Sequence, residues 1–487
     1  MNDKTATVTY LGRVLSVEPA YLGQLFEDDL SITLIEQGEP DPRNNWQRQM
    51  IQKPQRTFWY DTDPHGVAKF FSYAGYGPRI LKKLRAQGFE VVERDWLPSG
   101  LPAPRFDLLP KDLQWRGSQA QVMATMLASR CGTVVCPTGW GKTSISRLIP
   151  RIYPDSSIIF TVPSRDVARD LHEALSLDGP VGFCGDGTHD PQRVTVAITH
   201  SLKHCHRQAN LLIGDEAHAL VAESFREALV QFPRAKFLGM TASPSGRSDG
   251  GDQYIEAIFG PVIYEVPYQE AVESGNVVPI DVWVMQVPTG PNVQSIVRKD
   301  LKDRAGIWSN AYRNARVVEA VDLVTKRFAP GDPQILIMVD KIEHAYRLQQ
   351  VLPDFTVVSG TSTDENIDRL VDRGVLTPGQ KLCSRKDRDR YKAEFEAGTL
   401  RRAIATFIWS KGVDFVDLDV LIRADGTSSP IHSTQVPGRV SRLGHAGQKV
   451  RGVLVDFNDS FSPDLAARSK MRFKVYRQNG FKIEAIT

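Results

Sequence analysis

The stretch CPTGWGKTS, from Cys136 to Ser144, has the composition of a loop that binds phosphate groups. Its glycines let the backbone curl so that successive N–H groups point at one anion. An apolar, β-branched run at residues 132–135 precedes the loop, and a segment able to form a helix, residues 144–148, follows it. The first turn of that helix would add free N–H groups and a positive dipole end. A chance Gly-Lys-Thr in an ordinary loop is the alternative interpretation.

Two side chains of the loop suit a nucleoside triphosphate. Lys142 can place a positive charge beside the β and γ phosphates, and the Thr143 hydroxyl can ligate Mg²⁺. The residues expected to contact the nucleotide form one continuous run: Pro137, Thr138, Gly139, Trp140, Gly141, Lys142, Thr143 and Ser144. The first position of the usual pattern is glycine, and this chain has Cys136 there.

A second chemical pattern, Asp215-Glu216-Ala217-His218, follows the apolar run 211–213. Two carboxylates at the end of a buried strand are costly unless a cation or a reaction needs them. Asp215 can hold the hydration shell of Mg²⁺, and Glu216 can orient and deprotonate an attacking water. An exposed acidic turn is the alternative for this pair alone. Together with the phosphate loop, the pair favours a hydrolytic site.

The elements that must position these residues are short apolar runs that alternate with amphipathic stretches. The predicted strands of the first half are 133–135, 157–162, 194–198, 211–213 and 236–240, and those of the second half are 335–339, 355–358, 402–405, 419–423 and 452–456. This alternation predicts an α/β fold with two parallel-sheet lobes covered by helices. Ligands of such sheets bind at the carboxyl ends of the strands, where both motifs fall.

We expect a small α+β accessory domain before the lobes, and a helix after them. The predicted parts are 1–110 (accessory), 111–280 (first lobe), 281–310 (linker) and 311–487 (second lobe with a terminal helix). In the accessory part, the helix near 80–88 carries Lys82, Lys83 and Arg85 on one side. These cations are either a solvated face or a patch that contacts phosphates. The basic terminal helix, 466–476, is expected to be a solvated helix that packs on the second lobe.

Composition restricts the function only weakly. The 487 residues are 24% charged, and Lys plus Arg (60) barely exceed Asp plus Glu (57), which permits a nucleic-acid partner without arguing for one. The five cysteines form no regular framework and suit a reducing cytosol. No signal peptide and no membrane span is expected, so we predict a cytoplasmic protein. The cluster His204-Cys205-His206 lacks the second ligand pair that a zinc site needs.

The order of the motifs resembles that of superfamily 2 helicases and translocases. After the phosphate loop and the DEAH box come Thr241-Ala242-Ser243 and the segment QVPGRVSR at 435–442. Arg116 and Gln119 resemble the adenine-reading element of that superfamily. Other matching segments are 163–165, 199–202, 335–345, 405–406 and 412–414. The resemblance covers about 116–456 and is specific because the elements occur in one order.

The resemblance implies a motor of two RecA-like lobes that hydrolyses ATP with Mg²⁺ between them. It assigns hydrolysis to Glu216, Asp215, Lys142, Gln435, Arg439 and Arg442, the last two as arginine fingers. Arg116, Gln119 and Asp414 would contact ATP beside the phosphate loop. The implied nucleic-acid contacts are Pro163, Ser164, Arg165, Ser201, Ser359, Gly360 and Thr406. The implied coupling residues are His218, Thr241, Ser243 and Gly412.

Within the superfamily, residues 259–282 and, less strongly, 70–95 are similar to DNA helicases of the UvsW kind, which are found in phages and bacteria and are related to XPB and restriction motors. That family remodels forks and junctions in repair, recombination and replication. The resemblance therefore implies an ATP-dependent helicase on branched or duplex DNA, with recombination or replication proteins as partners. A duplex-translocating subunit of a restriction or defence complex and an RNA-dependent ATPase are the alternatives. We expect Trp140, a departure from the family pattern, to face outward.

Overall fold

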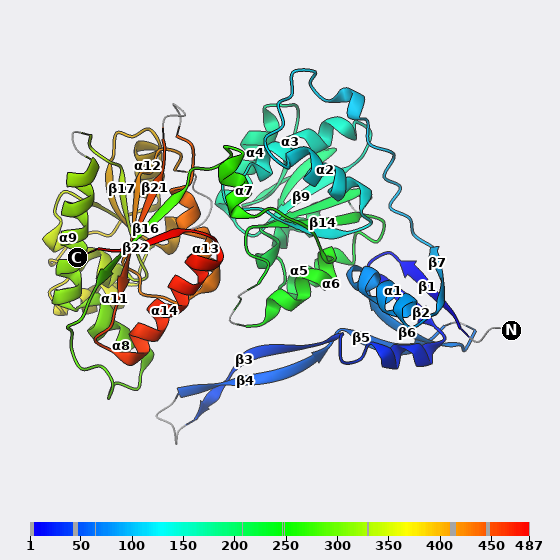
Figure 1. Cartoon of the computed structure of the whole chain (residues 1–487), viewed down its shortest axis with the longest axis horizontal. Helices are drawn as coiled ribbons and strands as arrows, with labels where there is room; N and C mark the ends of the chain where they lie inside the picture. The colour runs from blue at the N-terminus through cyan, green and yellow to red at the C-terminus, as the bar shows by residue number, and fades with distance from the viewer. Residues whose placement is uncertain are drawn as a thin grey trace. The chain divides into compact units, whose positions relative to one another are not determined.

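The apolar runs of the sequence form parallel strands in the computed structural model, which describes all residues except 1–3, 42–46, 64, 207, 246, 248, 329–330, 410–414, 445–448 and 487. The contacts divide the chain into two units. The first comprises Met1–Pro137 and Gly141–Val266, and the second comprises Thr138–Trp140 and Pro267–Thr487. Each unit is built around a mainly parallel sheet with helices against it (Figure 1).

The large sheet of the first unit has the order β11-β10-β12-β9-β13-β14-β8-β15, and all its pairs are parallel except β10 with β11. Its strands are β8 (Gly132–Val135), β9 (Ile158–Val162), β10 (Gly182–Gly185), β11 (Thr188–Asp190), β12 (Val194–Ile198), β13 (Leu211–Asp215), β14 (Lys236–Thr241) and β15 (Val262–Glu265). The helices are α2 (Gln119–Ala128), α3 (Lys142–Ile152), α4 (Arg165–Ser176), α5 (Glu223–Leu229) and α6 (Tyr254–Phe259). Strands β9, β12 and β14 are buried throughout, as expected for strands covered on both faces.

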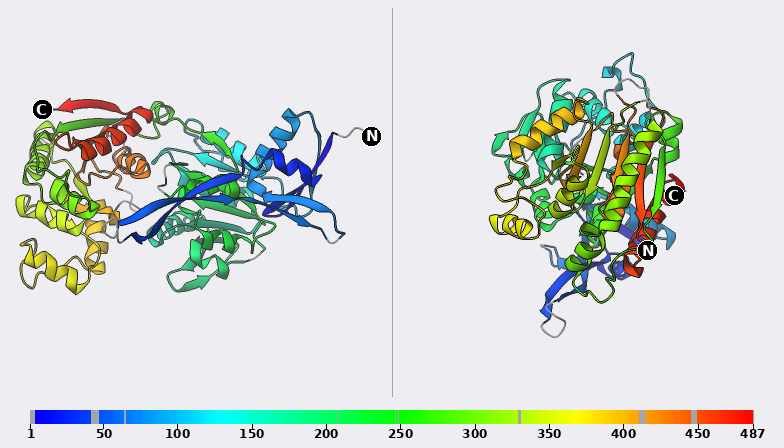
Figure 2. Two further views of the ribbon diagram at one scale, coloured as in Figure 1. Left: turned by 90° about the horizontal axis from the view of Figure 1, so that it is seen from below. Right: turned by 90° about the vertical axis from the view of Figure 1, so that its left-hand side faces the viewer.

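Ahead of this sheet lies a smaller one with the order β5-β6-β2-β1-β7. Its strands are β1 (Thr5–Leu11), β2 (Val14–Glu18), β5 (Phe58–Thr62), β6 (Ala68–Tyr73) and β7 (Glu90–Asp95), and α1 (Gly77–Ala86) packs beside β7. Between β2 and β5 the chain forms a separate antiparallel hairpin of β3 (Ser31–Asp41) and β4 (Gln47–Arg56). Figures 1 and 2 show this hairpin extending beyond the body of the first unit.

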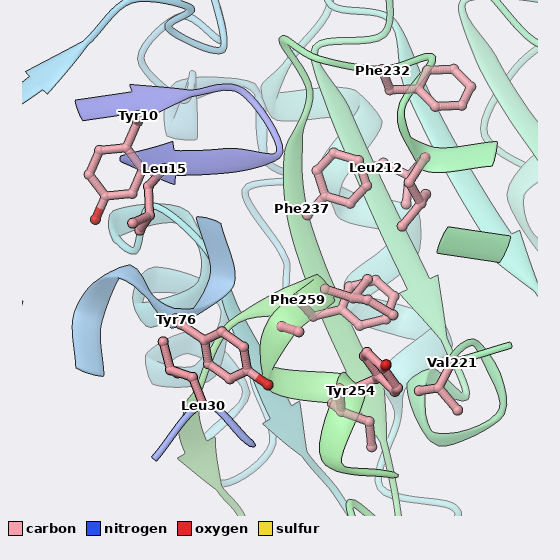
Figure 3. Packing of buried hydrophobic residues seen from close by; sticks show 14 of the residues in the cluster. Tyr10, Leu15, Leu30, Tyr76, Leu212, Val221, Phe232, Phe237, Tyr254 and Phe259 are labelled. Atoms are coloured by element: carbon pink, nitrogen blue, oxygen red, sulfur yellow. The ribbon is translucent and has the colours of Figure 1, made fainter. Parts of the chain in front are cut away.

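One hydrophobic core joins the small sheet to the large one. Tyr10 and Tyr76 from the N-terminal part belong to the same buried cluster as Phe237 and Phe259 (Figure 3). Arg13 lies over the ring of Phe237 and donates to the carbonyl oxygen of Ile258 at 2.6 Å. The N-terminal part is therefore packed firmly on the first lobe.

The second unit contains a parallel sheet with the order β18-β19-β17-β20-β21-β16-β22. Its strands are β16 (Ile280–Gln286), β17 (Ile335–Val339), β18 (Thr356–Val358), β19 (Arg402–Thr406), β20 (Val420–Arg423), β21 (Gly452–Asn458) and β22 (Lys482–Ile486). The helices are α7 (Tyr268–Glu273), α8 (Lys299–Asp303), α9 (Ala311–Phe328), α10 (Ile342–Val351), α11 (Asp364–Asp372), α12 (Arg385–Glu396), α13 (Pro430–Gln435) and α14 (Pro463–Gln478). The α/β fold with two parallel-sheet lobes is thus confirmed.

The second unit differs from the prediction in two places. Strand β16 lies largely in the segment expected to be a linker, and it pairs with β21 and β22 from the far end of the chain. Local spacing cannot reveal such a pairing. The terminal helix α14 packs on the second unit as predicted, but one of its cations is buried: Arg472 is 1% exposed and its Nε lies 2.9 Å from Asp456 Oδ2. Among the described residues, no helix is long and apolar enough to cross a membrane.

Candidate nucleotide site and nucleic-acid face

The phosphate loop connects β8 to α3. Gly139 and Gly141 have φ angles of +89° and +110°, in the left-handed region that favours glycine. A Cβ atom on Gly141 would lie only 2.6 Å from Gln119 Nε2, so a larger residue at this position would displace the Gln119 side chain. Lys142, Thr143 and Ser144 form the first turn of α3. The loop therefore has the curled backbone and helix start that suit a phosphate chain.

Gln119 reaches this loop from the start of α2. Its Oε1 accepts a hydrogen bond from the backbone N–H of Arg116 at 3.2 Å. Gln119 is buried, whereas the Arg116 side chain is exposed. The structure thus brings Gln119 to the predicted site and leaves the Arg116 side chain at the surface.

The two carboxylates stand where β13 ends. Glu216 has φ 56° and ψ 49°, which is uncommon for a residue with a side chain, and its N–H donates to Asp215 Oδ1 at 3.0 Å. Burial and the charge of Glu216 raise the pKa of Asp215 to about 6, while the charge of Lys142 opposes the shift. Lys142 and Asp215 therefore lie close enough to interact. Two adjacent half-buried carboxylates, of which Asp215 has a raised pKa, are suited to holding a divalent cation.

His218 joins the carboxylates to the next strand. Its Nδ1 lies 3.3 Å from Glu216 Oε2 and 3.0 Å from Thr241 Oγ1, at the end of β14. The N–H of Ser243 donates to the same Thr241 oxygen at 3.1 Å. The predicted coupling residues of the first lobe are thus brought together just where the neighbouring strands β13 and β14 end. Gly412 lies outside the described residues.

The predicted nucleic-acid contacts of the first lobe follow two paired strands, β9 and β12. Pro163 follows β9, Ser164 precedes α4, and the Ser164 Oγ atom is buried with no hydrogen-bond partner among the described residues. Arg165 pairs with Asp186 at 2.7 Å. Ser201 lies after β12 in a 3-10 helix, Thr199–His204, and is buried. These residues gather at one edge of the sheet.

The corresponding residues of the second lobe follow β18 and β19, which are also paired. Ser359 is fully buried, and its Oγ lies 3.3 Å from the carbonyl oxygen of Gly360. A Cβ atom on Gly360 would meet nothing within 4 Å. Thr406, the last residue of β19, is 8% exposed. Open space at Gly360 favours a backbone contact there over one from the Ser359 hydroxyl.

The arginines expected to act on the γ-phosphate belong to the second unit. Arg439 is buried in a short 3-10 helix, Pro437–Arg439, and Arg442 is half-buried three residues later. Gln435 is the last residue of α13. Asp414 lies outside the described residues. The roles of these residues toward ATP stay predictions.

One expectation needs correction. Trp140 is 1% exposed, so the prediction that it faces outward is wrong. Cys136 is also buried, and its N–H donates to Thr241 O at 2.9 Å, which joins the phosphate loop to β14. On α1, Lys83 and Arg85 form ion pairs with Asp29 (2.5 Å) and Glu93 (2.6 Å). These partners favour a solvated face on α1 over a phosphate-contacting patch.

Two comparisons of sequence show which known proteins the chain is similar to. Residues 112–246 match the family model "Type III restriction enzyme, res subunit". The "DNA 3'-5' translocase XPB2" of Sulfurisphaera tokodaii is 23% identical over 395 residues, which cover 77% of this chain and 88% of the relative.

Two solved structures share the fold. A fragment of a putative HsdR subunit of a type I restriction enzyme from Vibrio vulnificus has a TM-score of 0.52 at 17% identity and covers 94% of this chain and 92% of its own. A variant of S. cerevisiae Dbp5 bound to RNA and ADP BeF3 has a TM-score of 0.51 at 14% identity and covers 77% and 90%. With the ordered motifs and the two RecA-like lobes, these comparisons show that the chain is similar to superfamily 2 helicases, including XPB-type translocases and restriction motors.

Proposed function

We propose that this protein is an ATP-dependent DNA helicase or translocase that remodels branched or duplex DNA. The observation that carries the proposal is the proximity of Lys142 to Asp215, together with the contacts that link Glu216 through His218 to Thr241. This arrangement joins a hydrolytic site to the neighbouring strand β14. The name of the Sulfurisphaera relative, a DNA translocase, favours DNA as the substrate.

In this proposal, each part of the first lobe has a chemical role. The N–H groups of the curled loop and the charge of Lys142 hold the β and γ phosphates, and Gln119 holds the adenine with Arg116. Thr143 and Asp215 hold Mg²⁺, which when bound neutralises charge on the phosphates. Glu216 orients and deprotonates the attacking water from the end of β13.

The second lobe supplies the remaining groups in our proposal. Arg439 and Arg442 stabilise charge on the transferred phosphoryl group as arginine fingers, with Gln435 and Asp414 sensing the nucleotide. Contacts from Pro163, Ser164, Arg165, Ser201, Gly360 and Thr406 follow the nucleic-acid backbone. Such contacts carry little sequence information and weaken with salt. Repair, recombination or replication of DNA is the setting that we propose.

The test is a panel of nucleic acids in an ATPase assay. Phosphate release is measured with single-stranded DNA, duplex DNA, forked DNA and RNA of equal length, and Lys142→Ala serves as the control for contaminating ATPases. The proposal predicts the greatest stimulation by forked or duplex DNA. Greatest stimulation by RNA would replace it with an RNA-dependent ATPase.

A second candidate, a duplex-translocating motor subunit, is favoured by the match to the restriction family and the shared fold with the HsdR fragment. Displacement of a third strand from a DNA triplex reports translocation without unwinding. Triplex displacement combined with no separation of forked strands would select the translocase subunit over the helicase.

A further inference from the structure

The β3–β4 hairpin forms a sheet of its own, apart from the two larger sheets of the first unit. A two-stranded hairpin of this kind is marginally stable in water unless something anchors it. In both Figures 1 and 2 it extends past the rest of the first unit. The contacts that hold the hairpin therefore determine how it is connected to the proposed ATP site.

The anchor is the loop that follows Ser243 in the first lobe. The N–H of Ile35 donates to Asp249 O at 2.9 Å, and Gln253 Nε2 donates to Thr33 O at 2.9 Å. Gly250, with φ +70°, lies so close that a Cβ atom on it would be 2.5 Å from Thr33 O. The base of the hairpin is thus docked against the backbone of residues 249–253.

The same loop reaches back to the catalytic carboxylates. Arg247 Nη1 donates to the carbonyl oxygen of His218 at 3.2 Å, and its guanidinium holds the Asp249 carboxylate at 2.9 Å and 2.6 Å. These hydrogen bonds lower the pKa of Asp249, which keeps the pair charged. Since His218 also contacts Glu216, a continuous chain of contacts runs from the hydrolytic site to the hairpin.

The second strand of the hairpin suits a polyanion. Strand β4 (Gln47–Arg56) contains Arg48, Lys53 and Arg56 and no carboxylate, and Lys53 forms an exposed ion pair with Glu36 of β3 at 3.5 Å, which is weak in water. The side chains of Met50 and Ile51 are exposed between these cations, at 56% and 51%. A two-stranded β-ribbon fits the major groove of duplex DNA, and cations along one strand can meet its phosphates.

We propose that the hairpin binds the duplex arm of a branched DNA, and that Arg247 and Asp249 make this grip depend on the nucleotide at the ATP site. Arg247 is a positioning residue here, because it acts through His218 and Asp249. This inference rests on the proposed function, since it takes DNA as the substrate and ATP as the fuel. It adds a third contact region outside the two lobes, and a route by which that region senses hydrolysis.

The first test measures DNA binding. A forked DNA with a fluorescent label is titrated with the full chain at several salt concentrations, and affinity is read from fluorescence anisotropy. Arg48→Gln combined with Lys53→Gln should reduce the slope of log affinity against log salt by about 1.8, at about 0.9 for each lost phosphate contact. The matched control, Lys82→Gln with Arg85→Gln on α1, removes two other cations and should leave the slope unchanged. An unchanged slope in the variant with Arg48→Gln and Lys53→Gln would overturn the hairpin contact.

The second test measures the link to the nucleotide. The affinity for the same fork is compared without nucleotide and with a slowly hydrolysed ATP analogue, and the wild type should change by about 5-fold or more. Arg247→Met and Gly250→Ala should abolish this change, the second by pushing Thr33 away from the loop. The control is Arg105→Met, which breaks an equivalent pair with Asp107 (2.9 Å and 2.7 Å) and should retain the change.

The outcomes separate this inference from the proposed function. The link would be refuted if the affinity of Arg247→Met for the fork still changed with the nucleotide. It would also be refuted if the wild type bound the fork equally well with and without the nucleotide. Neither result affects stimulation of hydrolysis by DNA. The proposed function fails in a different assay, where RNA rather than DNA stimulates phosphate release most.

Discussion

A buried lysine at the start of β14 makes the stability of the first unit depend on pH in a calculable way. Lys236 is 9% exposed, and its Nζ donates to the carbonyl oxygen of Leu127 at 2.8 Å. Burial lowers the pKa of this ammonium group from 10.5 to about 8, and the charge of Cys131 opposes the shift only in part. Lys236 is the first residue of β14, and Thr241, which contacts His218, is the last residue of the same strand.

The direction of the change in stability with pH follows from the number of protons that the folded and unfolded states bind. Below pH 8 both states are protonated, and the folded state bears the full cost of burying the charge, about 3 kcal/mol for a pKa difference of 10.5 − 8. As the pH rises through 8 toward 10.5, the folded state loses the proton while the unfolded state keeps it, and stability increases. At pH 9.5 the remaining cost is about 1.4 kcal/mol.

Lys236→Met removes the titrating group. The variant also loses the hydrogen bond to Leu127, but that loss does not change with pH in this range. The wild type should therefore gain about 2 kcal/mol relative to the variant between pH 7 and pH 9.5. Urea unfolding of both proteins at the two pH values measures this gain, and Lys82→Met on the exposed side of α1 is the control. Parallel pH dependences in the wild type and Lys236→Met would refute the reasoning.

Further predictions concern both units. Lys142→Ala should abolish ATP hydrolysis, because it removes the charge beside the β and γ phosphates; phosphate release at the wild-type rate would contradict this. Arg442→Ala should keep nucleotide binding, measured with a fluorescent ATP analogue, and lose about 10³-fold in kcat; weakened binding with a normal kcat would disprove the finger role. Asp425→Asn should destabilise the second unit by about 3–5 kcal/mol in urea unfolding, because it leaves the buried Arg423 without the carboxylate that holds it at 2.9 Å. Burial alone would raise the pKa of Asp425, but Arg423 holds it below its usual value, so this stabilisation is present above pH 4 and should disappear as the pH falls below it.

The sequence was most informative where function depends on contiguous residues. The phosphate loop and the carboxylates after β13 are local patterns, and the strands before them are short apolar runs, so their positions could be predicted. Trp140 was misjudged because a single large side chain in a loop carries no periodicity. Its burial depends on contacts that only the folded chain makes.

The features of the structure that the sequence did not predict depend on contacts between segments far apart in the chain. Strand β16 pairs with strands from the end of the chain, and the core of the first lobe continues into the N-terminal sheet. No spacing distinguishes Arg472, buried against Asp456, from the exposed cations of the same helix. Arg247 and Asp249 belong to no motif, and only the structure places them between His218 and the hairpin.

The central claim is that ATP hydrolysis, for which Glu216 activates the water, powers the separation of DNA strands. Its most direct test is strand separation of a forked DNA by the wild type and by Glu216→Gln, in the presence of ATP. The account predicts that the wild type separates the strands and that Glu216→Gln binds ATP and the fork without separating them. Strand separation by Glu216→Gln at the wild-type rate would contradict the account.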